Sequence, residues 1–249
     1  MSFKKTVAII AISAAPLAYG QGAKDWQGEA ELGVLITSGN TEETNINGRL
    51  GLVHEVDDWR NMADFSSNYS ESENSDTGAD QTTAEKYKAA LETNYKFDER
   101  QYWFLRGAYE KDRFSGYDFE STASTGYGNR VWQRGERSFL DLSAGAGYRY
   151  NKLETVNSDG DDVEKEAIAR LAAQFNYALS ENALFHQRLS TEIGLDENNV
   201  ISQSETAIKA NIMGDLSMKA AYRVKHVSDA PAGVDSTDTE TSLSLLYGF

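Results

Sequence analysis

The strongest constraint on the fold is an alternation of apolar and polar residues that runs along most of the chain. From Trp26 to Ile36 apolar or small residues occupy the even positions, and mainly polar ones occupy the odd positions. Successive side chains of a β-strand point to opposite faces, so this segment is expected to form a strand with one apolar face. The turn-rich segment 37–41 follows, and the alternation resumes over 44–52. The start of the pattern therefore predicts a β-hairpin.

The same pattern recurs to the end of the chain and predicts twelve strands, with no helix and no linker between domains. The other ten are expected at 59–71, 83–97, 101–112, 119–132, 138–151, 163–179, 183–194, 200–213, 217–227 and 238–249. Trp132 has the wrong parity for its strand, which either a bulge or an inward-facing side chain would explain. Tight connections alternate with longer acidic ones at 72–81, 153–162 and 228–237. Short turns at one end and longer loops at the other are typical of an antiparallel outer-membrane β-barrel.

Composition alone suggests a different protein. The 249 residues carry a formal net charge of −15 and no cysteine, and the mean hydropathy is −0.56. The acidity argues against binding nucleic acid through its phosphates, and the lack of cysteine excludes disulfides. Averaged hydropathy would indicate a soluble protein. Averaged hydropathy does not identify a membrane β-barrel, because only every second residue of its strands needs to face lipid.

The first twenty residues have the order of features expected of a secretory signal peptide. Lys4 and Lys5 precede an apolar core at 7–15, and small residues at Ala18 and Gly20 suit cleavage before Gln21. We therefore expect residues 1–20 to be a signal peptide and residues 21–249 to form a single barrel domain.

Three further features favour a membrane barrel over a soluble periplasmic β-protein such as a sandwich, which also alternates. Many of the expected strands have twelve or more residues, whereas strands of soluble sheets usually have about 5–6. Aromatic residues lie near strand ends and predict two interfacial girdles; the candidates are Trp26, Trp59, Trp103, Tyr69, Tyr87 and Tyr109. The last strand resembles the signal read by the barrel assembly machinery, with Leu243, Leu245, Tyr247 and Phe249 as its residues.

Residues of inward parity include many charges of both signs. The main candidates for the lumen are Glu29, Glu31, Arg49, Asp64, Glu92, Arg106, Arg130, Arg149, Arg170, Arg188 and Arg223, and Lys86, Lys88, Glu110, His186, Lys209, Lys219 and Lys225 share that parity. One interpretation is a network of ion pairs that fills the barrel, since unpaired buried charges are costly. The other is a narrow polar channel, because twelve strands lie below the size of large water-filled pores.

Chemistry-bearing motifs are few. No P-loop, G-x-S-x-G or H-E-x-x-H is present. His54 and His226 have outward parity, as in outer-membrane phospholipases, but no serine partner is evident, so a lipid hydrolase is a minor alternative. Asn157, Asp159, Asp161 and Glu164 place oxygen ligands at the spacing of a calcium loop without matching an EF-hand. This weak candidate could hold a divalent cation that bridges to lipopolysaccharide.

Three segments resemble one family. The hairpin at 33–41 (GVLITSGNT), the segment 109–114 (YEKDRF) and the segment 143–150 (SAGAGYRY) are similar to the YdiY-like family of salt-induced outer membrane proteins, whose domain has no assigned function. The resemblance covers about residues 25–249. It implies an outer-membrane location and expression linked to salt or osmotic stress, and it brings no catalytic residues, cofactor or metal. The expected partners are the lipid bilayer, lipopolysaccharide and the assembly machinery, with the oligomeric state left open.

Overall fold

The computed structural model describes residues 25–37, 43–73, 79–156, 160–196, 199–231 and 233–249. The expected signal peptide at 1–20 lies outside these residues. The described chain forms twelve strands: β1 (Trp26–Thr37), β2 (Glu43–Val56), β3 (Trp59–Glu73), β4 (Asp80–Lys96), β5 (Gln101–Asp112), β6 (Tyr117–Arg134), β7 (Ser138–Leu153), β8 (Val163–Ala178), β9 (Ala183–Gly194), β10 (Val200–Met213), β11 (Leu216–Val227) and β12 (Thr237–Gly248).

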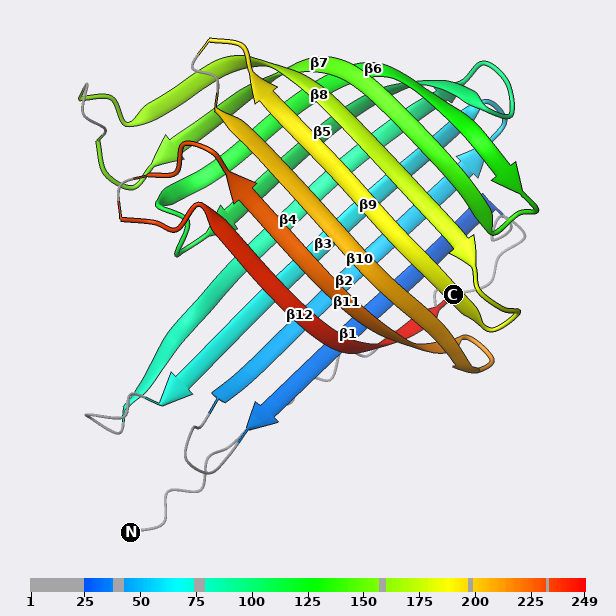
Figure 1. Ribbon diagram of the computed structural model, residues 1–249, viewed down its shortest axis with the longest axis horizontal. Helices are drawn as coiled ribbons and strands as arrows, with labels where there is room; N and C mark the ends of the chain where they lie inside the picture. Colours follow the sequence, from blue (N-terminus) through cyan, green and yellow to red (C-terminus); the bar gives the residue numbers. More distant parts are fainter. Residues whose placement is uncertain (1–24, 38–42, 74–78, 157–159, 197–198, 232) are drawn as a thin grey trace.

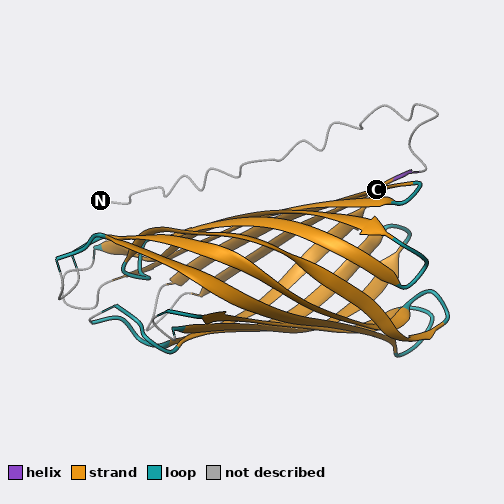
Figure 2. Ribbon diagram, turned by 90° about the horizontal axis from the view of Figure 1, so that it is seen from above, coloured by secondary structure: helices purple, strands orange, loops and turns teal. Residues whose placement is uncertain are grey.

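The strands form one closed antiparallel barrel in which each strand pairs with its neighbours in sequence and β1 pairs with β12 (Figure 1). The predicted fold class is therefore confirmed, and the sandwich alternative is wrong, because a single sheet closes on itself. Connections of two to four residues follow the even-numbered strands; we call this the turn end, and the C-terminus lies there (Figure 2). The opposite end is called the loop end. Within the described residues, no helix is long and apolar enough to cross a lipid bilayer.

The seam that closes the barrel is short and lies near the turn end. Glu29–Leu32 of β1 pair with Leu245–Gly248 of β12. Two further backbone hydrogen bonds join Gly28 and Phe249, with N···O distances of 2.7 and 2.9 Å. Position 28 needs glycine, because a Cβ there would lie 2.2 Å from the Phe249 ring. The last residue of the chain is therefore part of the closure.

The alternation in sequence becomes two faces of the barrel wall. Apolar side chains of outward parity are exposed on the outer surface, including Leu91 and Leu105, each 58% exposed, and Ile208. The charged side chains between them face the lumen, where Arg149 is only 2% exposed. Because the barrel pairs its backbone groups internally, such a wall suits an apolar solvent outside and a polar one inside.

Local departures from the expected strands have physical causes. The register shifts between Arg130 and Trp132, which is a β-bulge. The bulge leaves both Val131 and Trp132 on the outer face, where Trp132 stacks on Tyr177 with 6.5 Å between ring centroids. Of the two explanations for its parity, the bulge is therefore right. Gly214, with a φ of 54°, lets β10 turn into β11 through only two residues.

Candidate functional site: the charged lumen

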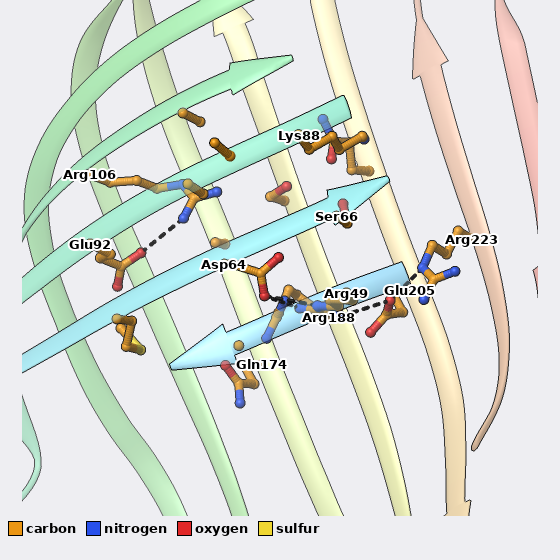
Figure 3. A pocket seen from close by; sticks show the side chains of 18 of the residues that line it. Arg49, Asp64, Ser66, Lys88, Glu92, Arg106, Gln174, Arg188, Glu205 and Arg223 are labelled. Atoms are coloured by element: carbon orange, nitrogen blue, oxygen red, sulfur yellow. Dashed lines mark hydrogen bonds and ion pairs between the residues drawn. The ribbon is translucent and has the colours of Figure 1, made fainter. Parts of the chain in front are cut away.

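The lumen contains a cavity of about 1220 Å³. Its lining runs from Asp98–Arg100, in the β4–β5 turn, to Phe114, in the β5–β6 connection at the loop end. All eleven main lumen candidates from the sequence line this cavity: Glu29, Glu31, Arg49, Asp64, Glu92, Arg106, Arg130, Arg149, Arg170, Arg188 and Arg223. Figure 3 shows several of them converging from different strands. Their role in the lumen depends on whether each charged side chain is paired with another residue.

The centre of the lumen is organised around Arg49 and Glu205. Arg49 of β2 donates from Nε and Nη2 to the same oxygen of Asp64, at 2.9 and 2.6 Å. Its Nη1 lies 3.5 Å from Glu205 of β10, beyond the three strands β1, β12 and β11. Glu205 also accepts from Nε of Arg223 at 2.6 Å and lies 3.6 Å from Nζ of Lys219. One carboxylate thus gathers three cations and ties opposite parts of the wall together (Figure 3).

A second group of charges, the loop-end cluster, consists of Lys86, Lys88, Glu110, Glu120 and Lys225. Nζ of Lys225 on β11 lies 3.1 Å from Glu110 of β5 and 2.7 Å from Glu120 of β6. Strands β5 and β11 are six apart in a ring of twelve, so this contact crosses the full lumen. Lys86 and Lys88 reach Glu110 as well, at 2.9 and 3.0 Å. The side chain of Lys225 is only 8% exposed. Lys225, Glu110 and Glu120 therefore form a nearly dry bridge across the barrel, with the more exposed Lys88 beside it.

A third group, the arginine group, consists of Arg106, Arg170 and Arg188. Arg106 touches Glu92 through one nitrogen at 3.5 Å, and Arg170 touches Glu192 through one nitrogen at 3.4 Å. Among the described residues, Arg188 has neither an ion pair nor a hydrogen bond, and it is exposed to the lumen. A guanidinium carries five N–H donors, so most donors of this group have no protein partner.

Other lumen charges are tightly paired. Arg130 binds Asp141 with two parallel hydrogen bonds of 2.7 and 2.8 Å. Lys209 binds Glu29 near the turn end. Arg149 donates from Nη2 to Glu166 and to the backbone oxygen of Asn199. The pairs of Arg130 and Arg149 join neighbouring strands, whereas Lys209–Glu29 joins β10 to β1. Nη1 of Arg149 has no hydrogen-bond partner among the described residues, but it is buried, unlike the exposed guanidinium of Arg188.

Sequence reasoning missed two residues that turn out to be central, Glu120 and Glu205. Both have inward parity in their strands, so the same alternation could have found them. The alternation gives only the face of each strand, however, and does not rank the residues on that face. Their importance comes from neighbours on distant strands, namely Lys225 for Glu120 and Arg49 for Glu205.

The outer surface carries the expected aromatic and C-terminal residues. Trp26, Trp59, Trp103, Tyr87 and Tyr109 are 44–53% exposed, while Tyr69 is half-buried. The three tryptophans lie at or near the turn-end termini of β1, β3 and β5. Leu243, Leu245, Tyr247 and Phe249 all point outward, and the last two rings stack. Their roles as girdle and assembly signal remain predictions.

Within the part of the chain that the structure describes, the histidines form no assembled catalytic site and no metal site is present. His54 stacks on Trp26 with 4.3 Å between ring centroids, and Nδ1 of His226 lies 2.9 Å from the hydroxyl of Thr237. Among the described residues no serine hydroxyl hydrogen-bonds a histidine, and no group of three or more acidic or histidine residues could hold a metal. Asn157 and Asp159 of the candidate calcium spacing lie outside those residues.

One exposed carboxylate at the turn end accepts backbone hydrogen bonds that change its pKa. Asp98, in the β4–β5 turn, accepts hydrogen bonds from the backbone N–H groups of Arg100 and Gln101, both at 2.7 Å. These bonds stabilise the carboxylate and lower the pKa of Asp98 below its ordinary value.

A closed antiparallel barrel with an apolar outside and a charged lumen defines the class of outer-membrane-type β-barrels. Within that class, residues 30–249 match the model of the family described as "Protein of unknown function, DUF481", and the chain belongs to that family. The YdiY-like name and the link to salt are not part of this match. No curated protein sequence matched the chain.

Three solved structures similar to this chain have low sequence identity to it, and one of the three has a TM-score above 0.5. The translocator domain of the autotransporter NalP from Neisseria meningitidis is similar with a TM-score of 0.51 and 11% identity, covering 90% of this chain and 86% of that one. The NanC porin gives a TM-score of 0.46 at 12% identity, with 90% and 97% covered. The β domain of the Bordetella autotransporter BrkA gives 0.44 at 13%, with the same coverages. These likenesses concern the architecture alone.

Proposed function

We propose that this protein is an integral outer-membrane barrel without enzymatic activity whose lumen is a narrow passage for ions and small polar solutes. The apolar outer face and the closed hydrogen-bonded wall support residence in a bilayer. The closed barrel, which is similar to the translocator domain of the autotransporter NalP, supports the outer membrane in particular. The proposed surroundings are therefore lipid and lipopolysaccharide on the outside and water in the lumen.

The single observation that carries the passage is the continuous cavity. Its lining joins the turn end, at Asp98–Arg100, to Phe114 at the loop end, and it is rich in charged side chains throughout. A cavity of about 1220 Å³ is small beside pores of roughly 16 strands and more. We therefore expect a low conductance that is limited by side chains rather than by the backbone wall.

A second candidate function, a structural barrel with a closed lumen, is favoured by the loop-end cluster. Lys225 bridges two opposite walls and is nearly dry. If this bridge persists in the membrane, it blocks the passage near the loop end. The two candidates then share the fold and the location and differ only in conduction.

Conductance of the purified, refolded protein in planar bilayers separates the two. We expect discrete current steps in 1 M KCl and larger steps in the variant Lys225→Ala, which removes the bridge. A variant of the exposed pair, Lys111→Ala, changes the charge by the same amount outside the lumen and serves as the control. Absence of steps from the protein and from Lys225→Ala alike would refute the passage and leave the structural barrel.

The folding of the barrel is tested first, since every other claim depends on it. A folded barrel in detergent should migrate differently on a gel before and after boiling, because the closed sheet resists detergent until heated. Identical migration of the two samples would contradict a stable barrel. Deletion of Phe249, which removes the two backbone bonds to Gly28, should lower the level of folded protein in the outer membrane.

The finer predictions from the sequence are tested separately. Expression at rising osmolarity, measured from transcript and protein levels, tests the link to salt. Lipid hydrolysis by the refolded barrel tests the lipase alternative, and activity lost in His226→Ala would overturn the non-enzymatic proposal. Unchanged thermal stability on titration with calcium would remove the metal candidate at Asn157, Asp159, Asp161 and Glu164.

A further inference from the structure

The arginine group differs from the other lumen charges because it has more cationic side chains than ion pairs with protein carboxylates. Each carboxylate near the group already has a partner other than Arg188: Glu92 touches Arg106, Glu192 touches Arg170, and Asp64 is held by two nitrogens of Arg49. After these pairs are formed, Arg188 remains as an unpaired cation. It lies close enough to Arg49 and Arg106 for mutual repulsion, and Arg170 is within the same range of Arg106 and Arg188.

The nearest carboxylate in the sheet attracts Arg188 but forms no ion pair with it. Glu205 is its direct neighbour across β9 and β10. Yet Glu205 is engaged by Arg223 at 2.6 Å, Arg49 at 3.5 Å and Lys219 at 3.6 Å, and it makes no ion pair with Arg188. With three cations already on one carboxylate, a fourth would gain little, so the positive charge of Arg188 stays available to the lumen.

The surroundings of Arg188 supply hydrogen-bond donors and room. Gln174 is its neighbour across β8 and β9, and its side chain points into the cavity, where it has no protein partner among the described residues (Figure 3). Arg106 and Arg170 each use a single nitrogen at 3.4–3.5 Å and keep their other N–H donors free. All of these donors line the one cavity.

We infer that Arg188, together with the free donors of Arg106, Arg170 and Gln174, forms an oxyanion-binding subsite in the middle of the lumen. A guanidinium fork matches the two oxygens of a carboxylate or phosphate and binds them through parallel hydrogen bonds. The ligand class is therefore a small solute that carries a carboxylate or a phosphate. A monatomic anion such as chloride can balance the charge but cannot use the fork.

This subsite deepens the proposed function, because a binding position within a passage selects which solutes cross it. A cation surrounded by other cations in a confined space is costly unless an anion joins it. An oxyanion in transit would lower that cost at this level of the lumen. Single-nitrogen contacts to Glu92 and Glu192 would hold Arg106 and Arg170 in place without exhausting their donors.

The test is binding of inorganic phosphate and of acetate to the full refolded barrel in detergent, followed by NMR of the arginine Nε–H groups, with chloride as the reference anion. We expect saturable shifts with phosphate and acetate at concentrations where chloride has no effect. Arg188→Gln should weaken phosphate binding at least tenfold. Arg188→Lys, which keeps the charge and loses the fork, should weaken it by a smaller factor.

The matched control is Lys96→Gln. Lys96 lines the same cavity but is paired with Glu55 at 2.8 Å, and its loss removes the same unit of charge. We expect its phosphate affinity to stay within twofold of the unchanged protein. Equal shifts by phosphate and chloride, or equal weakening by Lys96→Gln and Arg188→Gln, would overturn the subsite.

A bilayer measurement separates the subsite from the passage itself. Phosphate should reduce the KCl current of the unchanged barrel and have less effect on Arg188→Gln. If phosphate binds in the NMR experiment and no current is seen in the bilayer, the passage fails while the subsite stands. If current flows and phosphate neither binds nor blocks, the subsite fails while the passage stands.

Discussion

The loop-end cluster and the arginine group lie in one lumen and are both rich in cationic side chains, yet their charges are satisfied in different ways. In the loop-end cluster, Lys225 meets two carboxylates from the opposite wall, and its side chain is 8% exposed. In the arginine group, Arg188 meets none and is open to the cavity. The first region resembles a structural core made of charges. The second has unpaired, accessible donors, as a ligand-binding site does.

The difference teaches that inward charge by itself does not indicate function in a barrel. Charged side chains whose hydrogen bonds are satisfied across the lumen stabilise the barrel as a packed core would, because they connect strands that are not neighbours. Charges that leave donors free contribute little to stability and can bind solutes. The comparison predicts that substitutions in the two regions will separate effects on stability from effects on binding.

The largest effect is expected from breaking the loop-end cluster. Lys225→Met removes the cation between Glu110 and Glu120 and leaves Glu120 buried without an ion pair, while Glu110 keeps Lys86 and Lys88. Removing one partner of a buried pair typically costs about 3–5 kcal/mol. Unfolding in urea, followed in lipid vesicles, should show this loss. The exposed pair is the control, since Lys111→Met should cost at most about 1 kcal/mol. Similar losses in both variants would contradict the distinction.

A smaller loss is expected at the centre of the lumen. Arg49→Gln removes the paired hydrogen bonds to Asp64, whose side chain is 38% exposed and can be rehydrated. Hydrogen bonds to charged groups contribute about 1.5–3 kcal/mol, and access to lumen water should bring this variant to the lower part of that range. The same urea experiment measures it. A loss as large as that of Lys225→Met would show that the centre is as dry as the loop-end cluster.

Arg188→Gln should barely change stability. The residue makes no ion pair or hydrogen bond with the described residues, so its loss should stay within about 0.5 kcal/mol, or stabilise the barrel by relieving repulsion with Arg106. Urea unfolding without added phosphate measures this. A clear destabilisation would mean that Arg188 has a structural partner after all, and the contrast with the loop-end cluster would disappear.

The sequence predicted the strands and their ring because both depend on local information. A period of two fixes which side chains face outward, and the short turns fix which strands are neighbours. The tryptophan at position 132 marks the limit of this reasoning. Its wrong parity fits either a bulge or an inward ring, and only the register shift after Arg130 decides between them.

The pairing of lumen charges could not be predicted in the same way. Lys225 and Glu110 are 115 residues apart, and their strands face each other across the barrel. Alternation places both side chains inside the barrel, but it does not give their positions along the barrel axis. These positions depend on how the strands are staggered around the ring. For the same reason, alternation could not predict that Arg188 would remain without an ion pair while Arg49 would form one.

The smallest effect is expected outside the lumen, at the turn that carries Asp98. Its carboxylate accepts the N–H groups of Arg100 and Gln101, and this lowers the pKa of Asp98 in the folded state. The unfolded value is about 3.9, so the stabilisation is complete above that pH and is lost as the pH falls through the lower folded value. Asp98→Asn keeps an acceptor oxygen and loses the charge. The difference in stability between the two proteins should therefore be present at pH 7 and shrink as the pH falls below about 3.9, whereas Glu99→Gln controls for the loss of charge in the same turn. A difference that does not change as the pH falls would show that the turn is stabilised by the geometry of the acceptor and not by its ionisation.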